Sequence, residues 1–228
     1  MSLCALFPGE TAMPTQPAEY VDAIEHLPSG SALVVPDVSW AEYEALLAEL
    51  GDGHAVRVSY DEGRLEIVTP SAKHEKCKEF ILRLVHVLAT ELGTNLETFG
   101  STTFKQKTLK KGAEPDTCFY VEHAALVVGK DELDPAVDPP PDVIVEVDVS
   151  HGSVRKMAFY AQIGVPELWR YDGRRAVMYR LSGTSYQETP ASLAFPSFTA
   201  DTLTALIRQI DTEGQQPVLE AFRKSLRA

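Results

Sequence analysis

The segment from Asp142 to Val149 alternates between two kinds of position. Valine stands at every second place, and the places between carry Asp142, Ile144, Glu146 and Asp148. A period of two is typical of a β-strand, and a face made only of valine requires a core that buries it. The opposite face has two interpretations: a strand with one solvent-exposed side, or a site that uses the carboxylates.

Helical periodicity appears in four other segments. Ser39-Trp-Ala-Glu42 has the form of a capping box and predicts a helix that ends at Gly51. A long helix is expected from Pro70-Ser71 to Gly93, because its apolar residues recur at helical spacing. Shorter helices are expected over 153–163 and from about residue 199 to the C-terminus.

Hairpins and single strands account for most of the remaining chain. Residues 55–60 and 64–69 alternate around Asp61-Glu-Gly63, and 167–171 and 175–181 flank Asp172-Gly173, a strong hairpin signal. Further strands are expected at 95–99, 102–109 and 116–121, with a turn at 110–112, and near Tyr186. The helix expected over 153–163 is long enough for a crossover from the strand 142–149 to a parallel strand at 167–171.

The fold class is therefore α/β, with a mixed central β-sheet flanked by helices and additional β-hairpins. The chain has 228 residues, which suits one domain over 18–228 after a flexible N-terminus, residues 1–17. With 44% apolar and 24% charged residues the composition is ordinary, and no apolar run is long enough for a membrane span. The start lacks a secretory signal, and the three cysteines form no Cys-x-x-Cys pair, so a cytoplasmic protein without zinc or disulfides is expected.

The net charge of −12 argues against broad, non-specific binding to nucleic acid. The charge is uneven, however: residues 73–111 contain eight Lys or Arg and four Glu. Two interpretations stay open for this segment. It is either a solvated helix and loop surface, or a local basic patch in which Lys105, Lys107, Lys110 and Lys111 contact a nucleic-acid backbone.

The spacing of the carboxylates along the strand 142–149 limits which of them can share a metal ion. Asp142 and Glu146 would lie about 13 Å apart along one strand, too far to share an ion. Asp116 heads the strand thirty residues earlier, and if the two strands pair, Asp116 and Glu146 meet at one end of the sheet. Mg²⁺ or Mn²⁺ prefers such oxygen ligands, and Asp148, two residues further, is expected to bind the ion or support it.

Lys156 follows the carboxylates in the first turn of the next predicted helix. The helix dipole disfavours a cation there, which suggests a compensating role in holding a phosphate or a water molecule. The alternative is a solvated cation that costs about 1 kcal/mol or less.

These residues resemble the site of a PD-(D/E)XK nuclease: Pro115-Asp116, then Glu146-Val-Asp148, then Lys156. The wider chain, from about Trp40 to Phe198, is similar to the Uma-two family of restriction-endonuclease-like proteins. The matching stretches are Gly63-Arg-Leu-Glu-Ile-Val-Thr-Pro70, Gly100-Ser-Thr-Thr103, Ala113-Glu-Pro-Asp116, Pro140-Pro-Asp-Val-Ile-Val-Glu-Val147, and Gly164-Val-Pro-Glu-Leu-Trp-Arg-Tyr-Asp172.

The resemblance implies a restriction-endonuclease-like core and a role for each site residue. Asp116 and Glu146 would be metal ligands, Lys156 the catalytic lysine, and Glu75 a supporting carboxylate on the long helix. Asp148 stands where the nuclease lysine usually stands. A solvated helix face explains Glu75 equally well, and His74 is expected to be a surface residue of the first turn.

Two functions are consistent with these observations. The first is a Mg²⁺- or Mn²⁺-dependent endonuclease that hydrolyses DNA, and the second is a non-catalytic module for binding or assembly that keeps the nuclease fold. Asp116, Glu146 and Lys156 favour the first, and the net charge favours the second. A homodimer is expected if the apolar strand Leu168–Tyr171 supplies a symmetric patch.

Overall fold

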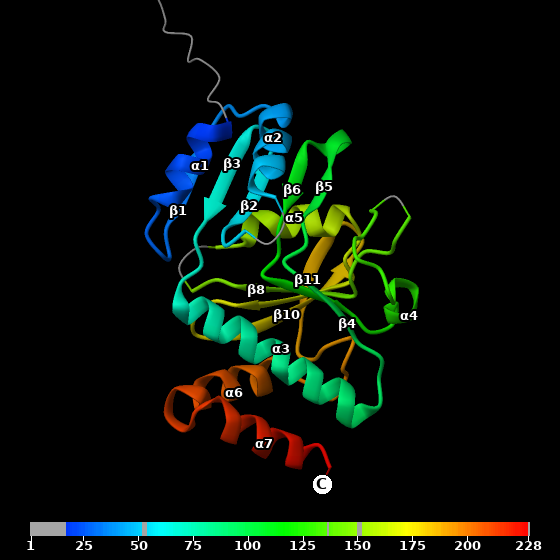
Figure 1. Cartoon of the computed structure of the whole chain (residues 1–228). Helices are drawn as coiled ribbons and strands as arrows, with labels where there is room; N and C mark the ends of the chain where they lie inside the picture. Colours follow the sequence, from blue (N-terminus) through cyan, green and yellow to red (C-terminus); the bar gives the residue numbers. More distant parts are fainter. Residues whose placement is uncertain (1–16, 52–53, 136, 150–151, 228) are drawn as a thin grey trace, which may run out of the picture.

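The computed structural model describes residues 17–51, 54–135, 137–149 and 152–227. The predicted flexible N-terminus lies outside these ranges, except for Pro17, which begins helix α1. Figure 1 shows a smaller sheet at one end of the molecule, a larger sheet in the middle and the helices α3, α6 and α7 at the other end. The helices are α1 (Pro17–Glu25), α2 (Trp40–Leu50), α3 (Ala72–Leu92), α4 (Ala124–Val127), α5 (Val154–Gln162), α6 (Ala200–Glu213) and α7 (Gln215–Ser225).

The larger sheet has six strands in the order β11-β10-β9-β8-β7-β4. Strands β8 and β9 run parallel and every other neighbouring pair is antiparallel, so the sheet is mixed, as predicted. Helix α5 connects the two parallel strands and is the predicted crossover. The strands are β4 (Glu97–Gly100), β7 (Thr117–Tyr120), β8 (Val143–Val147), β9 (Glu167–Tyr171), β10 (Ala176–Ser182) and β11 (Ser185–Thr189).

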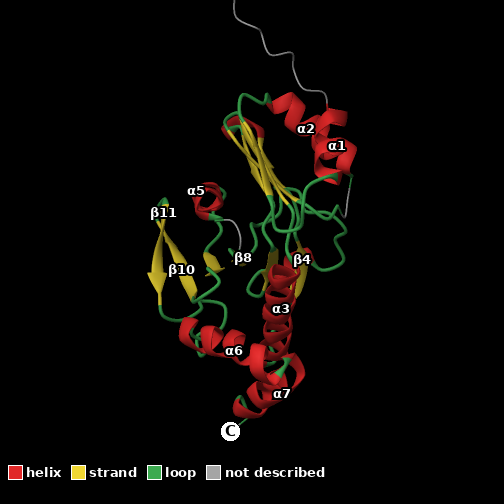
Figure 2. Cartoon of the chain, turned by 90° about the vertical axis from the view of Figure 1, so that its left-hand side faces the viewer, coloured by secondary structure: helices red, strands yellow, loops and turns green. Residues whose placement is uncertain are grey.

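The smaller sheet has five antiparallel strands in the order β1-β3-β2-β6-β5. Helices α1 and α2 cover one face, where Trp40, Tyr43 and Tyr60 pack ring against ring. The other face is turned toward α5 (Figure 2). The strands are β1 (Ala32–Val35), β2 (Arg57–Asp61), β3 (Arg64–Val68), β5 (Phe104–Gln106) and β6 (Lys111–Ala113).

The turn predicted at 110–112 is misplaced. Lys111 and Gly112 belong to β6, and the chain reverses earlier, through the 3₁₀ turn Lys107–Leu109 and Lys110, whose φ is +49°. Gly112 has another reason to be glycine, because a Cβ there would lie 2.2 Å from the hydroxyl oxygen of Tyr43. This glycine permits a close approach between α2 and β6 and does not mark a turn.

Strand β8 is buried on both faces, so the interpretation as a strand with a solvent-exposed side is wrong. The valine face packs against α3, α6 and α7 in the largest apolar cluster, and Ile144 on the other face packs against Phe159 and Leu168. Glu146 lies on this second face and is 2% exposed. A carboxylate at such a position needs partners, because an unpaired buried charge is costly.

The strand Leu168–Tyr171, suggested as a dimerisation patch, is not exposed. Strand β9 lies between β8 and β10, and Leu168, Trp169 and Tyr171 are buried in the core. The observation on which the homodimer was predicted is therefore wrong, and the homodimer itself stays a prediction. Across the part of the chain that the structure describes, every helix is too short or too polar to cross a membrane.

Candidate active site

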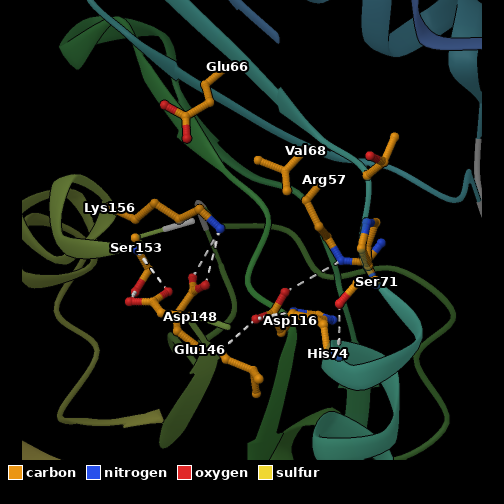
Figure 3. A pocket seen from close by; sticks show the side chains of 14 residues that line it. Arg57, Glu66, Val68, Ser71, His74, Asp116, Glu146, Asp148, Ser153 and Lys156 are labelled. Atoms are coloured by element: carbon orange, nitrogen blue, oxygen red, sulfur yellow. Dashed lines mark hydrogen bonds and ion pairs between the residues drawn. The ribbon is translucent and has the colours of Figure 1, made fainter. Parts of the chain in front are cut away.

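A small cavity of about 40 Å³ lies where the two sheets meet the first turns of α3 and α5 (Figure 3). Its lining includes four of the five residues predicted for the site: Asp116, Glu146, Asp148 and Lys156. Four carboxyl groups and two permanent cations line it, together with the imidazole of His74. The volume suffices for a few water-sized groups and not for a larger organic ligand.

Asp116 and Glu146 meet because β7 and β8 pair in the expected way. The antiparallel register places Thr117 opposite Val145, so Asp116 and Glu146 are the next pair at the end of the ladder. Asp116 Oδ2 accepts a hydrogen bond of 2.7 Å from the amide of Val147, which fixes the carboxylate beside β8. Both side chains are buried, Asp116 with 5% and Glu146 with 2% of its surface exposed.

Lys156 extends from the first turn of α5 to the same point. Its Nζ donates to the two oxygens of Glu146 at 3.3 and 3.2 Å and to the carbonyl of Glu114 at 2.9 Å. One turn further along α5, the hydroxyl of Tyr160 donates to Glu146 Oε1 at 2.6 Å. Helix α5 therefore holds Glu146 through two side chains at the i and i+4 positions of one face.

The pKa values of Glu146 and Lys156 are both raised in this site. Burial raises the pKa of Glu146 to about 8 against the lowering effect of Lys156, and the nearby Asp116 raises it further. Burial opposes protonation of Lys156, yet Glu146 and Asp116 outweigh it and raise the lysine pKa. The two shifts agree physically: the lysine faces several carboxylates, whereas Glu146 faces one lysine and two further carboxylates.

His74 lies in the site, and its predicted place on the surface is wrong. The residue is 8% exposed, and its Nε2 lies 2.9 Å from Asp116 Oδ2. Burial works against the charged imidazole, but the bond to Asp116 prevails and raises the pKa of His74. The prediction failed because the first turn of α3 faces the cavity between the sheets instead of solvent.

Glu75 reaches the site indirectly. Its carboxylate lies 2.5 Å from Lys78 Nζ and 3.2 Å from His74 Nδ1, and its side chain is 40% exposed. His74 therefore stands between Glu75 and Asp116, and Glu75 is not among the residues that line the cavity. The geometry suits a residue that orients His74, and direct support of an ion by Glu75 stays a prediction.

Asp148 lines the cavity, but its oxygens are occupied. Oδ1 accepts from the amide of Ser153 at 2.9 Å, and Oδ2 accepts from the Ser153 hydroxyl at 3.1 Å and from Arg170 Nε. These bonds tie the end of β8 to the start of α5 and to β9. Asp148 thus positions the helix that carries Lys156, and its role as a direct metal ligand stays a prediction.

The residues fit a divalent cation of the Mg²⁺ type. Such an ion is usually held by one or two carboxylates, with water and substrate oxygens completing its ligands. Asp116 and Glu146 supply two carboxyl groups that line the same cavity. Among the described residues, no three His, Cys, Asp or Glu side chains are arranged as a complete metal site. The protein alone therefore offers a partial ligand set, which water and substrate would complete.

Three residues of the site were missed or misjudged from the sequence: Arg57, His74 and Tyr160. Arg57 comes from β2 of the smaller sheet, and its Nε lies 3.9 Å from Asp116 Oδ1. No local pattern marks Arg57, because its place depends on how the two sheets pack. Tyr160 had a readable signal, since it stands four residues after Lys156 on a predicted helix.

The basic patch is partly neutralised. Lys105 lies 3.7 Å from Glu44, and Lys111 lies 3.1 Å from Asp61 and 3.7 Å from Glu62. Lys107 lines a separate cavity of about 530 Å³, bounded by β5 and by residues 133–135 and 138–140. Contact of these lysines with nucleic acid stays a prediction.

Comparison with known proteins gives a family match and similar solved structures. A search of curated proteins found no match. The chain is similar to a solved structure from Anabaena variabilis described as a "putative nuclease belonging to DUF820", with 17% sequence identity and a TM-score of 0.49 over 75% of this chain and 99% of that chain. The model of the Uma2 family, described as "Putative restriction endonuclease", matches residues 40–210. Because this match covers most of the chain, the protein is a member of the Uma2 family.

Proposed function

We propose that this protein is a metal-dependent endonuclease that hydrolyses phosphodiester bonds of DNA. The observation that carries the proposal is the meeting of Asp116, Glu146 and Lys156, from three separate elements, in one cavity. The family description and the nuclease-like order of these residues support the same reaction class.

Asp116 and Glu146 would hold Mg²⁺ or Mn²⁺. A bound ion of this kind supplies positive charge to a phosphate oxygen and lowers the pKa of a water molecule. Tyr160 and the amide of Val147 keep the two carboxylates in place, so little reorganisation is needed on binding. Asp148 fixes the start of α5 and thereby the direction of Lys156.

Lys156 would act on the reacting groups. Its ammonium lies beside Glu146 and keeps two donors directed at carboxylate oxygens. When an ion neutralises those oxygens, the lysine can orient the attacking water or offset charge that develops on the phosphate. This role explains why a cation occupies the first turn of α5, where the helix dipole disfavours it.

The test is cleavage of supercoiled plasmid DNA with Mg²⁺ or Mn²⁺. The wild type should nick or linearise the plasmid, EDTA should abolish the activity, and Lys156→Ala should lower the rate at least about 100-fold. Lys76→Ala is the matched control, because Lys76 pairs with Asp211 on an exposed part of α3. Activity that survives EDTA, or an equal effect of the two lysine variants, would contradict the proposal.

The second candidate is a binding or assembly module without turnover. It is favoured by the net charge of −12 and by the pairing of Lys105 and Lys111 with carboxylates. The plasmid assay separates the candidates: a folded wild type that binds DNA and never cleaves it, with either ion, supports the module. Sedimentation velocity at micromolar concentration tests the predicted homodimer.

A further inference from the structure

Arg57 is a buried arginine whose guanidinium group lacks some of its hydrogen-bond partners among the described residues. It is 9% exposed, and its Nη1 donates to the carbonyl of Val56 at 3.0 Å. Its Nε is buried and has no hydrogen-bond partner among the described residues. Nε lies 3.9 Å from Asp116 Oδ1, and Nη2 lies 3.9 Å from Glu75 Oε1, so both contacts are ion pairs too long for a hydrogen bond.

This arrangement is unusual for a purely structural arginine. Buried charged groups are normally hydrogen-bonded, since the desolvation penalty of an ion is recovered only with good geometry. Figure 3 shows the Arg57 side chain extending from the smaller sheet toward Asp116, at the side of the cavity opposite Lys156. The Nε–H of Arg57 thus points toward Asp116 beside the cavity and has no hydrogen-bond partner among the described residues.

The surroundings of Arg57 favour an anion. Ser71 at the N-terminus of α3 and Ser153 at the N-terminus of α5 both line the cavity. The N-terminal end of a helix carries partial positive charge and attracts anionic groups. Two helix ends, Arg57 and Lys156 therefore lie around Asp116 and Glu146, and they offset part of the negative charge of the carboxyl groups in the lining.

We propose that Arg57 binds a non-bridging oxygen of a substrate phosphate, opposite Lys156. The guanidinium group suits this role because its planar fork of donors matches phosphate geometry and stays charged when desolvated. The smaller sheet would then contribute directly to substrate binding, through β2. This inference rests on the proposed nuclease function for the identity of the substrate, and the site itself requires only a phosphate group.

The test compares Arg57→Gln and Arg57→Lys with the wild type. Arg83→Gln is the matched control, because Arg83 is an exposed arginine of α3 that donates a hydrogen bond to Gln215. The first probe is inorganic phosphate, titrated against a chloride control of equal ionic strength while thermal unfolding is followed. Phosphate should stabilise the wild type and Arg83→Gln, and Arg57→Gln should need at least about tenfold more phosphate for the same effect.

The second probe is a fluorescein-labelled DNA duplex, with anisotropy measured at several salt concentrations in Mg²⁺. All proteins carry Lys156→Ala so that cleavage does not interfere. Arg57→Gln should weaken binding at least about tenfold and lower the salt slope by about one unit. Arg57→Lys should keep the slope and still bind more weakly than arginine, because it keeps the charge and loses the fork.

The outcomes distinguish this inference from the proposed function. If phosphate binds through Arg57 but DNA is neither bound nor cleaved, the anion site stands and the nuclease function fails. If DNA is cleaved and Arg57→Gln binds phosphate and DNA as Arg83→Gln does, the function stands and the inference is overturned. Should Arg57→Gln not fold, equal phosphate and DNA binding by Arg57→Lys and wild type would overturn it.

Discussion

The two ends of β8 each carry a buried carboxylate, and the chain uses them differently. Asp142 accepts hydrogen bonds from the amides of Val121 and His123 at 2.7 and 2.9 Å, and from the His123 ring at 2.5 Å. Among the described residues, Glu146 is bonded only by the side chains of Lys156 and Tyr160, and it lines a cavity. Asp142 does not line that cavity.

Asp142 and Glu146 differ in whether a ligand can replace their hydrogen-bond partners. Backbone amides cannot leave Asp142 without unfolding the turn before α4, so this carboxylate serves the architecture. The Lys156 side chain, which reaches Glu146 from α5, can change partners when a ligand enters the cavity. On β8, the buried acid that is bonded by side chains and adjoins a cavity is therefore the candidate for function.

The largest effect on stability is expected at the Asp142 end. Asp142→Ala leaves the part-buried amides of Val121 and His123 without their acceptor and should lower the free energy of unfolding by about 3 kcal/mol. Urea denaturation measures the change, with Asp211→Ala as the control, because Asp211 forms an exposed pair with Lys76. Equal midpoints for the two variants would mean that Asp142 does not anchor the turn.

A smaller effect is expected from Tyr160→Phe at the Glu146 end. The variant loses the 2.6 Å hydrogen bond to Glu146 and should cost about 1 kcal/mol of stability. It should also weaken Mn²⁺ binding several-fold, because Glu146 is then held by Lys156 alone among the side chains. Tyr186→Phe loses a comparable bond to the carbonyl of Val165 and should leave the metal affinity unchanged. Equal Mn²⁺ affinities for both variants would remove the positioning role of Tyr160.

The smallest effect is the pH dependence of the Asp142 end. The hydrogen bond to Asp142 raises the pKa of His123 above its ordinary value of 6.5, with a minor contribution from Glu122. Because the folded pKa is higher than the unfolded one, this stabilisation is complete below pH 6.5 and is lost as the pH rises through the folded value. The gain should stay below about 1 kcal/mol, since the His123 side chain is 40% exposed.

The measurement is the difference in unfolding free energy between wild type and His123→Gln. It should be larger at pH 5.5 than at pH 8.5. A difference that does not vary with pH would show that the His123 ring stays neutral beside Asp142.

Much of the difference between Asp142 and Glu146 could be predicted from the sequence, because local residue patterns indicate local structure. Alternation identified β8 and its buried valine face, and helix signals placed α3 between Ser71 and Gly93, as the structure has it. The idea that Asp116 and Glu146 meet required only that β7 and β8 pair, and they do. The distance along one strand correctly separated Asp142 from that site.

The rest depended on packing between distant segments. The second face of β8 seemed open to solvent because nothing in its own residues reveals that α5 covers it. Arg57 and His74 join the site only because the smaller sheet and the first turn of α3 converge on Asp116. A side chain placed by such contacts leaves no periodic signal in its own neighbourhood.

The central claim is that the carboxylates at one end of β8 bind a metal ion while the carboxylate at the other end does not. Calorimetric titration of Mn²⁺ into wild type, Asp116→Ala, Glu146→Ala and Asp142→Ala tests it most directly, with folding of each variant checked by circular dichroism. Asp116→Ala and Glu146→Ala should lose the strongest binding site, whereas Asp142→Ala should keep it at a temperature where it is folded. If all four proteins bind Mn²⁺ alike, or none binds it even with DNA present, the claim is contradicted.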